Sequence, residues 1–342
     1  MNAGVRIRRI AYAAVALTFA LVIVGGVVRI SDSGLGCGPA GSGTEGWPLC
    51  GGRVIPLVDA NMIVEYSHRI LAATVTGLIA ALVWITRRRM PERRALVRLS
   101  TAAFGLILAQ AALGGLTVEN GLKEELVATH LGIAMLQIGL LIAIAFLARS
   151  SSRDPRRRAV PVASRGIRAL SVAATTAVLA TIVAGGYMSA SELHGTGSHE
   201  VDVHTACGQQ FPSCGGEFMP FGRSRELDIH LTHRAFMYLA TALVLALFVA
   251  ALRRRRRDDV PVEESRALTQ AGAMSVGLLG VQVLLGATNV WAGEHAWLVV
   301  AHLAGGTLLW SSLVYLTLLV NGVREPAPAR APREPEPEAV PA

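Results

Sequence analysis

The hydrophobic positions of the chain form long, nearly uninterrupted runs separated by short polar segments. A run of about 20 apolar residues can cross the roughly 30 Å of hydrocarbon in a bilayer as one α-helix. Eight runs are long enough, at residues 10–28, 62–86, 96–117, 126–148, 168–188, 230–252, 267–291 and 296–320. The pattern predicts an all-α polytopic membrane protein with eight transmembrane helices and both termini on the same side.

Composition and charge agree with this class. Of the 342 residues, 52% are apolar and 16% are charged, which exceeds the apolar fraction of ordinary soluble domains. The formal charge of +8 comes largely from basic clusters such as RRRMPERR (87–94), RDPRRR (153–158) and RRRRR (253–257). Basic residues beside short loops resist translocation, so we expect these clusters and both termini to be cytoplasmic. The expected surroundings are a bacterial-type plasma membrane, and no nucleic-acid partner is needed to explain the basic residues.

Several motifs occur twice along the chain. VGGVVR (24–29) matches AGGYMS (184–189), EYSHR (65–69) matches HLTHR (230–234), QAALGGLTV (110–118) matches QVLLGATNV (282–290), and THL (129–131) matches AHL (301–303). The offsets are 160, 165, 172 and 172 residues, which differ only by changes in loop length. Such a parallel repeat predicts two four-helix bundles in the same orientation.

This organisation divides the chain into five parts. They are a cytoplasmic N-terminus (1–9), a first four-helix bundle (10–148), a cytoplasmic linker (149–166), a second bundle (167–320) and a disordered cytoplasmic tail (321–342).

Four of the nine histidines occupy matched positions in the two halves: His68 and His130 in the first, His233 and His302 in the second. Each lies near the outer end of an even-numbered span. Helices two and four of a unit run in the same direction, so two imidazoles at equal depth can face each other across the bundle. That arrangement suits the two axial ligands of a haem iron. Interfacial histidines and the proton relay of a transporter are the alternatives.

The residues beside these histidines carry further information. Arg69 and Arg234 directly follow a histidine, where a guanidinium could pair with a haem propionate or simply extend to the interface. Glu65 stands three residues before His68, on the same helix face, and the matched position in the second half is His230. A carboxylate at this depth is costly unless it is paired or functional. Glu65 is therefore a candidate catalytic base, or else it orients His68 or caps the helix.

The four cysteines lie in two outer loops, where an oxidising compartment allows disulfides. One pair per loop, Cys37–Cys50 and Cys207–Cys214, is the simplest of three connectivities. Each bond would either staple its loop or act as a redox relay. The second loop also holds three evenly spaced histidines, His194, His199 and His204, which belong either to an accessory metal site or to a solvated loop.

Over about residues 10–320 the chain resembles the haem A synthase family, membrane enzymes that convert haem O to haem A for cytochrome oxidase. The resemblance rests on GGVVRISDSGLGC, WPLC, EYSHRILAATVTG, THLGIAML, HLTHR and AHLAGGTLLW. It implies that His233 and His302 hold a haem B cofactor for electron transfer. It also implies that His68, His130 and Glu65 form the site where haem O is bound and oxidised. Cys37 and Cys50 match the family's loop pair, although GPAGSGTEG makes this loop longer than usual.

The implied reaction oxidises one methyl substituent of haem O to a formyl group by two successive hydroxylations and a dehydration. Either water or dioxygen could supply the oxygen. Expected partners are haem O, an electron donor and the farnesyltransferase that produces haem O, and a homo-oligomer is left open. The alternatives are a non-enzymatic dihaem b-type electron carrier and a two-repeat transporter.

Overall fold

The computed structural model describes residues 3–55, 59–149, 163–191, 203–255, 262–293 and 295–322. In these ranges the chain forms eight long α-helices and two short 3-10 helices. They are α1 (Ala3–Ile30), η1 (Ser33–Leu35), η2 (Gly43–Glu45), α2 (Ala60–Arg89), α3 (Arg94–Glu119), α4 (Glu124–Arg149), α5 (Arg165–Ala190), α6 (Arg225–Arg255), α7 (Val262–Ala292) and α8 (Ala296–Val320). All eight α-helices are long and apolar enough to cross a membrane. The predicted class and the predicted number of spans are confirmed.

Several helices extend beyond their apolar runs. α2 continues to Arg89 and α6 to Arg255, and each ends in a turn of three arginines. Cations in the last helical turn interact favourably with the helix dipole, and long arginine side chains reach water from just inside the interface. Hydrophobicity therefore locates the membrane-crossing part of each helix but not its full length.

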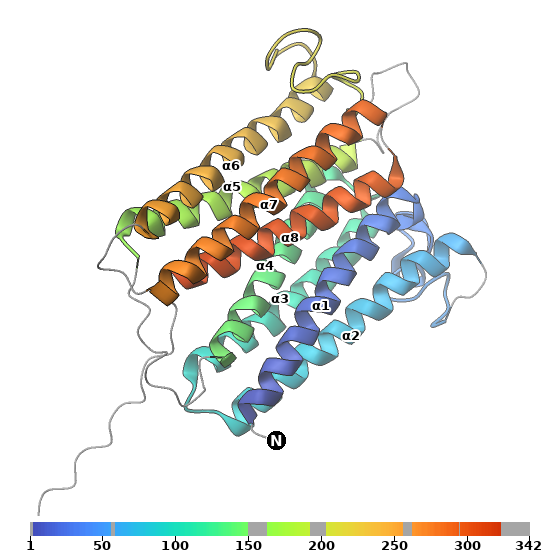
Figure 1. Cartoon of the computed structure of the whole chain (residues 1–342). Helices are drawn as coiled ribbons and strands as arrows, with labels where there is room; N and C mark the ends of the chain where they lie inside the picture. The colour runs from blue at the N-terminus through green and yellow to red at the C-terminus, as the bar shows by residue number, and fades with distance from the viewer. Residues whose placement is uncertain are drawn as a thin grey trace, which may run out of the picture.

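Neighbouring helices follow the chain order in two closed sets (Figure 1). In the first set α1 contacts α2 and α4, and α3 contacts α2 and α4. In the second, α5 contacts α6 and α8, and α7 contacts α6 and α8. The sets meet where α4 contacts α5 and α8, and where α1 contacts α8. That the two sets are related as an internal repeat stays a prediction.

The central helices are α4 and α8. In the apolar 18-residue stretch of each of these two helices, 56% and 50% of the residues are buried. The corresponding fraction in the other six helices is 22–28%. Their direct link is the indole of Trp310, whose Nε1 donates a hydrogen bond to the Met135 carbonyl at 2.8 Å, entirely within the protein interior. At one end of the bundle, Arg225 of α6 pairs with Glu124 of α4 at 2.7 Å. The two sets are thus joined both by apolar packing and by specific polar contacts.

Some predictions fall outside the described residues. These concern most of the 149–166 linker, His194 and His199, and the tail beyond residue 322.

Replacing Trp310 by Phe should test the link between the central helices. The substitution removes the hydrogen bond to Met135 but keeps an aromatic ring, so we expect the free energy of unfolding in detergent to fall by about 1 kcal/mol. The control is Trp84→Phe, because Trp84 is 59% exposed on α2. Equal unfolding midpoints for the two variants would show that the Trp310 contact does not join the halves.

Candidate functional site

The four matched histidines lie at corresponding positions in their helices. His68 and His233 each come eight residues after the first residue of α2 and α6. His130 and His302 each come six residues after the first residue of α4 and α8. With a rise of about 1.5 Å per residue, all four imidazoles stand two turns or so from the same end of the bundle.

Each of these imidazoles packs against a glycine of the preceding helix. The pairs are His68 with Gly25, His130 with Gly114, His233 with Gly185, and His302 with Gly286. A Cβ placed on either second-half glycine would lie 2.9 Å from the histidine Cε1 atom, closer than real Cβ contacts allow. The first-half distances are slightly longer, 3.2 Å and 3.3 Å. A glycine inside a helix lowers helix stability by about 1 kcal/mol relative to alanine. We therefore explain glycine at these four positions by the space that it leaves for the imidazole.

The second-half pair is the better defined. The ring centroids of His233 and His302 are 6.4 Å apart, with the ring planes at 70°. The Nδ1 atom of His233 donates a hydrogen bond to the Thr181 carbonyl at 3.0 Å. Because that bond places the proton on Nδ1, Nε2 carries the free lone pair.

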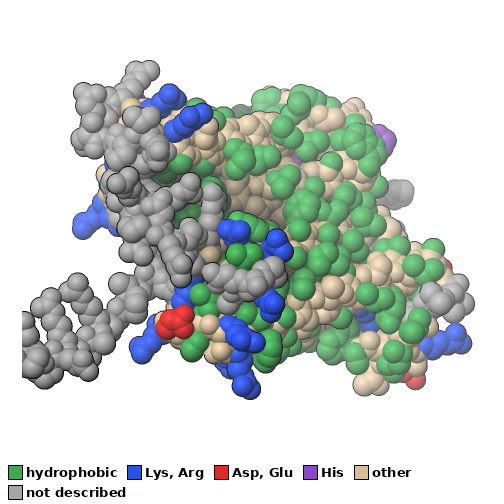
Figure 2. Space-filling view, turned by 60° about the horizontal axis from the view of Figure 1, so that its bottom comes forward, with side chains coloured by type: hydrophobic (Ala, Val, Ile, Leu, Met, Phe, Trp, Pro, Cys, Tyr) green, Lys and Arg blue, Asp and Glu red, His purple; other side chains and the backbone are tan. Residues whose placement is uncertain are grey.

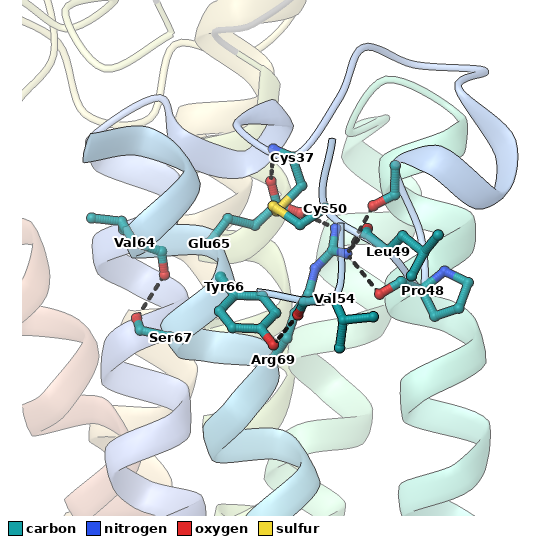
Figure 3. Close-up of a disulfide and its surroundings, with 11 residues drawn as sticks. Cys37, Pro48, Leu49, Cys50, Val54, Val64, Glu65, Tyr66, Ser67 and Arg69 are labelled. Carbon is teal, nitrogen blue, oxygen red and sulfur yellow. Dashed lines mark hydrogen bonds and ion pairs between the residues drawn. A yellow bond between two sulfur atoms is a disulfide. The ribbon is translucent and has the colours of Figure 1, made fainter. Parts of the chain in front are cut away.

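Glu65 is buried and held by two partners, as Figure 3 shows. Its Oε2 accepts a hydrogen bond of 2.7 Å from the backbone N–H of Cys37, and its Oε1 accepts one from Arg69. The carboxylate thus connects α2 to the disulfide loop above it. The corresponding residue of the second half makes a similar link, because the Nδ1 of His230 donates to the Val203 carbonyl at 2.9 Å.

Both arginines hold the outer loops. Arg69 donates to the carbonyls of Gly46 and Leu49, each at 2.7 Å (Figure 3). Arg234 donates to the Gln210 carbonyl at 2.9 Å and to the Ser213 carbonyl at 3.0 Å. Propionate pairing and interfacial extension were the roles expected of these two side chains from the sequence. Loop anchoring is a further role, which the sequence did not reveal, and propionate binding stays a prediction.

The loops themselves share a motif that the sequence analysis also missed. WPLCGG (47–52) and FPSCGG (211–216) both place Pro, Cys and two glycines after an aromatic residue, at an offset of 164 that fits the repeat. Gly51 and Gly215 have φ angles of 58° and 61°, a left-handed conformation that favours glycine. The disulfides Cys37–Cys50 and Cys207–Cys214 close the two loops, which is the pairing within each loop that we expected.

The accessory metal site considered for His194, His199 and His204 stays untested. Only His204 of the three lies in the described part of the chain. Among the residues that the structure describes, no group of three or more His, Cys, Asp or Glu side chains converges as a metal site.

The chain belongs to a family of membrane proteins involved in cytochrome oxidase assembly. The model of the COX15-CtaA family, described as cytochrome oxidase assembly protein, matches residues 59–314, which include all four matched histidines. Among similar curated proteins is the heme A synthase of Symbiobacterium thermophilum, 30% identical over 321 residues, covering 92% of this chain and 95% of that protein. The heme A synthase of Alkalihalophilus pseudofirmus is 28% identical over 302 residues, covering 88% of this chain and 93% of its own length. That of Caulobacter vibrioides is 29% identical over 349 residues, covering 91% and 94%.

Arg234→Lys should loosen the second disulfide loop. Lysine keeps the charge but carries one nitrogen, whereas Arg234 reaches the Ser213 carbonyl with Nη1 and the Gln210 carbonyl with Nη2 through its planar fork. We expect Cys207 and Cys214 to be reduced and alkylated several-fold faster in the variant under mild dithiothreitol, as followed by mass spectrometry. Arg223→Lys is the control, since Arg223 forms only an exposed ion pair with Glu217. Equal labelling rates in both variants would contradict the anchoring role.

Proposed function

We propose that this protein is a haem A synthase, which oxidises a methyl substituent of haem O to a formyl group by two successive hydroxylations and loss of water. The observation that carries the proposal is the set of four histidines at equal depth, each packed against a helical glycine. Membership of a cytochrome oxidase assembly family, with relatives named heme A synthase, supports the reaction. Haem O is then the substrate and haem A the product.

His233 and His302 are the ligands of a resident haem B in this proposal. The two imidazoles would hold the haem through one nitrogen each, and their ring centroids, 6.4 Å apart, leave room for a metal ion between the rings. The hydrogen bond from His233 Nδ1 to Thr181 leaves Nε2 free for the iron. When bound, haem B supplies one-electron redox chemistry. The glycines at 185 and 286 keep the imidazoles close to their neighbouring helices.

His68 and His130 hold haem O in the first half. When water supplies the oxygen, each hydroxylation breaks one C–H bond of the methyl group and one O–H bond of the water and forms the C–O bond. It gives up two electrons to an acceptor and two protons, one of which a nearby carboxylate can accept. Glu65 lies one helical turn from His68 and has the buried position that this role needs. Protonation at Oε1 would weaken its ion pair with Arg69, so proton uptake by Glu65 and anchoring of the first loop are coupled.

Arg69 and Arg234 also bind the haem propionates in this account. A guanidinium has five N–H donors, so each arginine can hold its loop carbonyls and still donate to a carboxylate. The loops, the arginines and the propionates would then form one polar layer over each haem.

We infer that this layer faces outward and that both termini are cytoplasmic. The helix ends opposite the disulfide loops carry the arginine clusters of α2 and α6. Figure 2 shows Lys and Arg side chains gathered toward one end, beside a surface covered by apolar side chains. Basic ends of this kind stay on the cytoplasmic side of a membrane.

Electrons must cross the protein whichever oxygen source is used. With water, each hydroxylation gives up electrons to an acceptor; with dioxygen, each consumes electrons from a donor. A haem B in the second half and an external electron partner fit either route. The farnesyltransferase that makes haem O is the natural supplier of the substrate.

Glu65→Gln tests the proposal in cells that produce haem O. The wild-type protein should yield haem A on extraction and chromatography. The variant should retain bound haem O at the wild-type ratio to haem B but form at least about a hundredfold less haem A, because amide nitrogen and oxygen cannot accept the proton. Glu125→Gln, on the exposed start of α4, is the control. A normal haem A yield from Glu65→Gln would exclude Glu65 as the base, and a wild type that makes no haem A would overturn the function.

A further inference from the structure

Gln137 of α4 has a buried side-chain amide to which the proposed function assigns no role. Its side chain is only 1% exposed, and neither its Oε1 nor its Nε2 has a hydrogen-bond partner among the described residues. An unsatisfied polar group inside a protein is destabilising by about 1–3 kcal/mol, and most buried amides have partners. The surroundings of Gln137 therefore call for a polar group that none of the described residues provides.

The helix geometry shows which way Gln137 projects. Residues Gly132, Met135 and Gly139 of α4 face α5 and α8: a Cβ on Gly132 would meet Val183, the Met135 carbonyl accepts from Trp310, and a Cβ on Gly139 would meet Trp310. At about 100° per residue, His130 and Gln137 lie on the opposite side of α4, directly above one another.

That opposite side is the interior of the first four helices. Leu141, one turn beyond Gln137, belongs to the apolar cluster that includes Ile79 of α2 and Ala103 of α3. Gln137 is seven residues beyond His130, roughly 10 Å further along the helix. The amide thus stands below the first histidine pair, on the side of the bundle that His130 faces.

The second half has no counterpart to this amide. The offset of 172 that matches His130 with His302 also matches Gln137 with Leu309. Leu309 is 3% exposed and belongs to an apolar cluster built mainly from residues of α5–α8. The two halves therefore differ at this matched position: the first half has a buried hydrogen-bonding side chain, Gln137, and the second half has an apolar side chain, Leu309.

We propose that Gln137 hydrogen-bonds the hydroxyl group on the isoprenoid substituent of haem O, and thereby selects haem O over haem B in the first half. This inference rests on the proposed function. Haem O differs from haem B by a hydroxyl-bearing isoprenoid chain in place of a vinyl group, so the hydroxyl is the polar feature that distinguishes them. A glutamine amide can both donate to and accept from a hydroxyl.

The contrast between Gln137 and Leu309 would explain two preferences: that of the first half for haem O and that of the second half for haem B. A buried site that must hydrogen-bond a ligand hydroxyl discriminates strongly against a ligand that lacks it, because the amide is then left unpaired. An apolar residue at the matched position favours the vinyl group. One position in each half would thus direct haem O to the first pair of histidines and haem B to the second.

The test compares Gln137→Met with Gln282→Met. Methionine has nearly the length of glutamine but no amide, and Gln282 is a second-half glutamine whose Oε1 also has no partner in the described chain. Each protein is purified from cells that make both haem O and haem B, and the extracted haems are separated by chromatography. We expect the ratio of haem O plus haem A to haem B to fall about tenfold in Gln137→Met and to stay unchanged in Gln282→Met.

Binding is measured separately from turnover. Protein from cells that lack haem O is titrated with haem O or with haem B, and the wild-type preference for haem O should be lost in Gln137→Met. The low-spin haem B spectrum shows whether Gln137→Met is folded. If Gln137→Met does not fold, Gln137→Leu, which introduces the residue of the matched second-half position, is used in its place. An unchanged preference in the folded variant, as expected if Gln137 only holds a water molecule, would overturn this inference. A wild type that binds haem O but never forms haem A would instead contradict the proposed function.

Discussion

The close packing of four imidazoles against four glycines is the constraint on which the rest of the structure depends. A histidine ring fits between two helices only where the facing residue has no side chain, and contacts of 2.9–3.3 Å to an added Cβ leave no room for alanine without movement. The contact fixes the spacing and the register of α1 with α2, α3 with α4, α5 with α6, and α7 with α8. It also sets all four imidazoles at one depth, which is the condition for holding a flat ligand edge-on in each half.

The outer loops build on this frame. Each arginine follows its histidine directly, so a helix turn that orients an imidazole also places a guanidinium under the loop. The loop carbonyls then accept from that guanidinium, and in the first half Glu65 completes the network through Cys37 and Arg69. Glu65, Arg69 and the loop closed by Cys37 and Cys50 are therefore parts of one hydrogen-bonded unit rather than separate features. This explains how a carboxylate is tolerated at such depth: both of its oxygens have partners.

The sequence predicted the helices, and it predicted that four histidines occupy matched positions in them, because both depend on a periodic or repeated pattern. Hydrophobic runs locate the spans, and the doubled HR and HL pairs locate the matched histidines. The packing of each imidazole on a glycine was not predicted, because it depends on how neighbouring helices face one another. The loop contacts of Arg69 and Arg234 could not be predicted, since they depend on the path of irregular backbone that folds over each helix end. The WPLCGG and FPSCGG repeat was visible in the chain, but only the structure gives a reason to compare two loops of different length. The environment of Gln137 likewise depends on the rotation of α4 between its neighbours.

Glycine at these four positions leaves the space that the histidines occupy, and with it the haem binding proposed for them. The most direct test compares Gly185→Ala, which adds a Cβ 2.9 Å from His233, with Gly280→Ala, where an added Cβ would meet nothing within 4 Å. The measurement is the amount of low-spin haem B per purified protein, from the visible spectrum and haem extraction. The account predicts that Gly185→Ala loses most of its low-spin haem B while Gly280→Ala keeps the wild-type amount. Full retention of low-spin haem B by Gly185→Ala would contradict it.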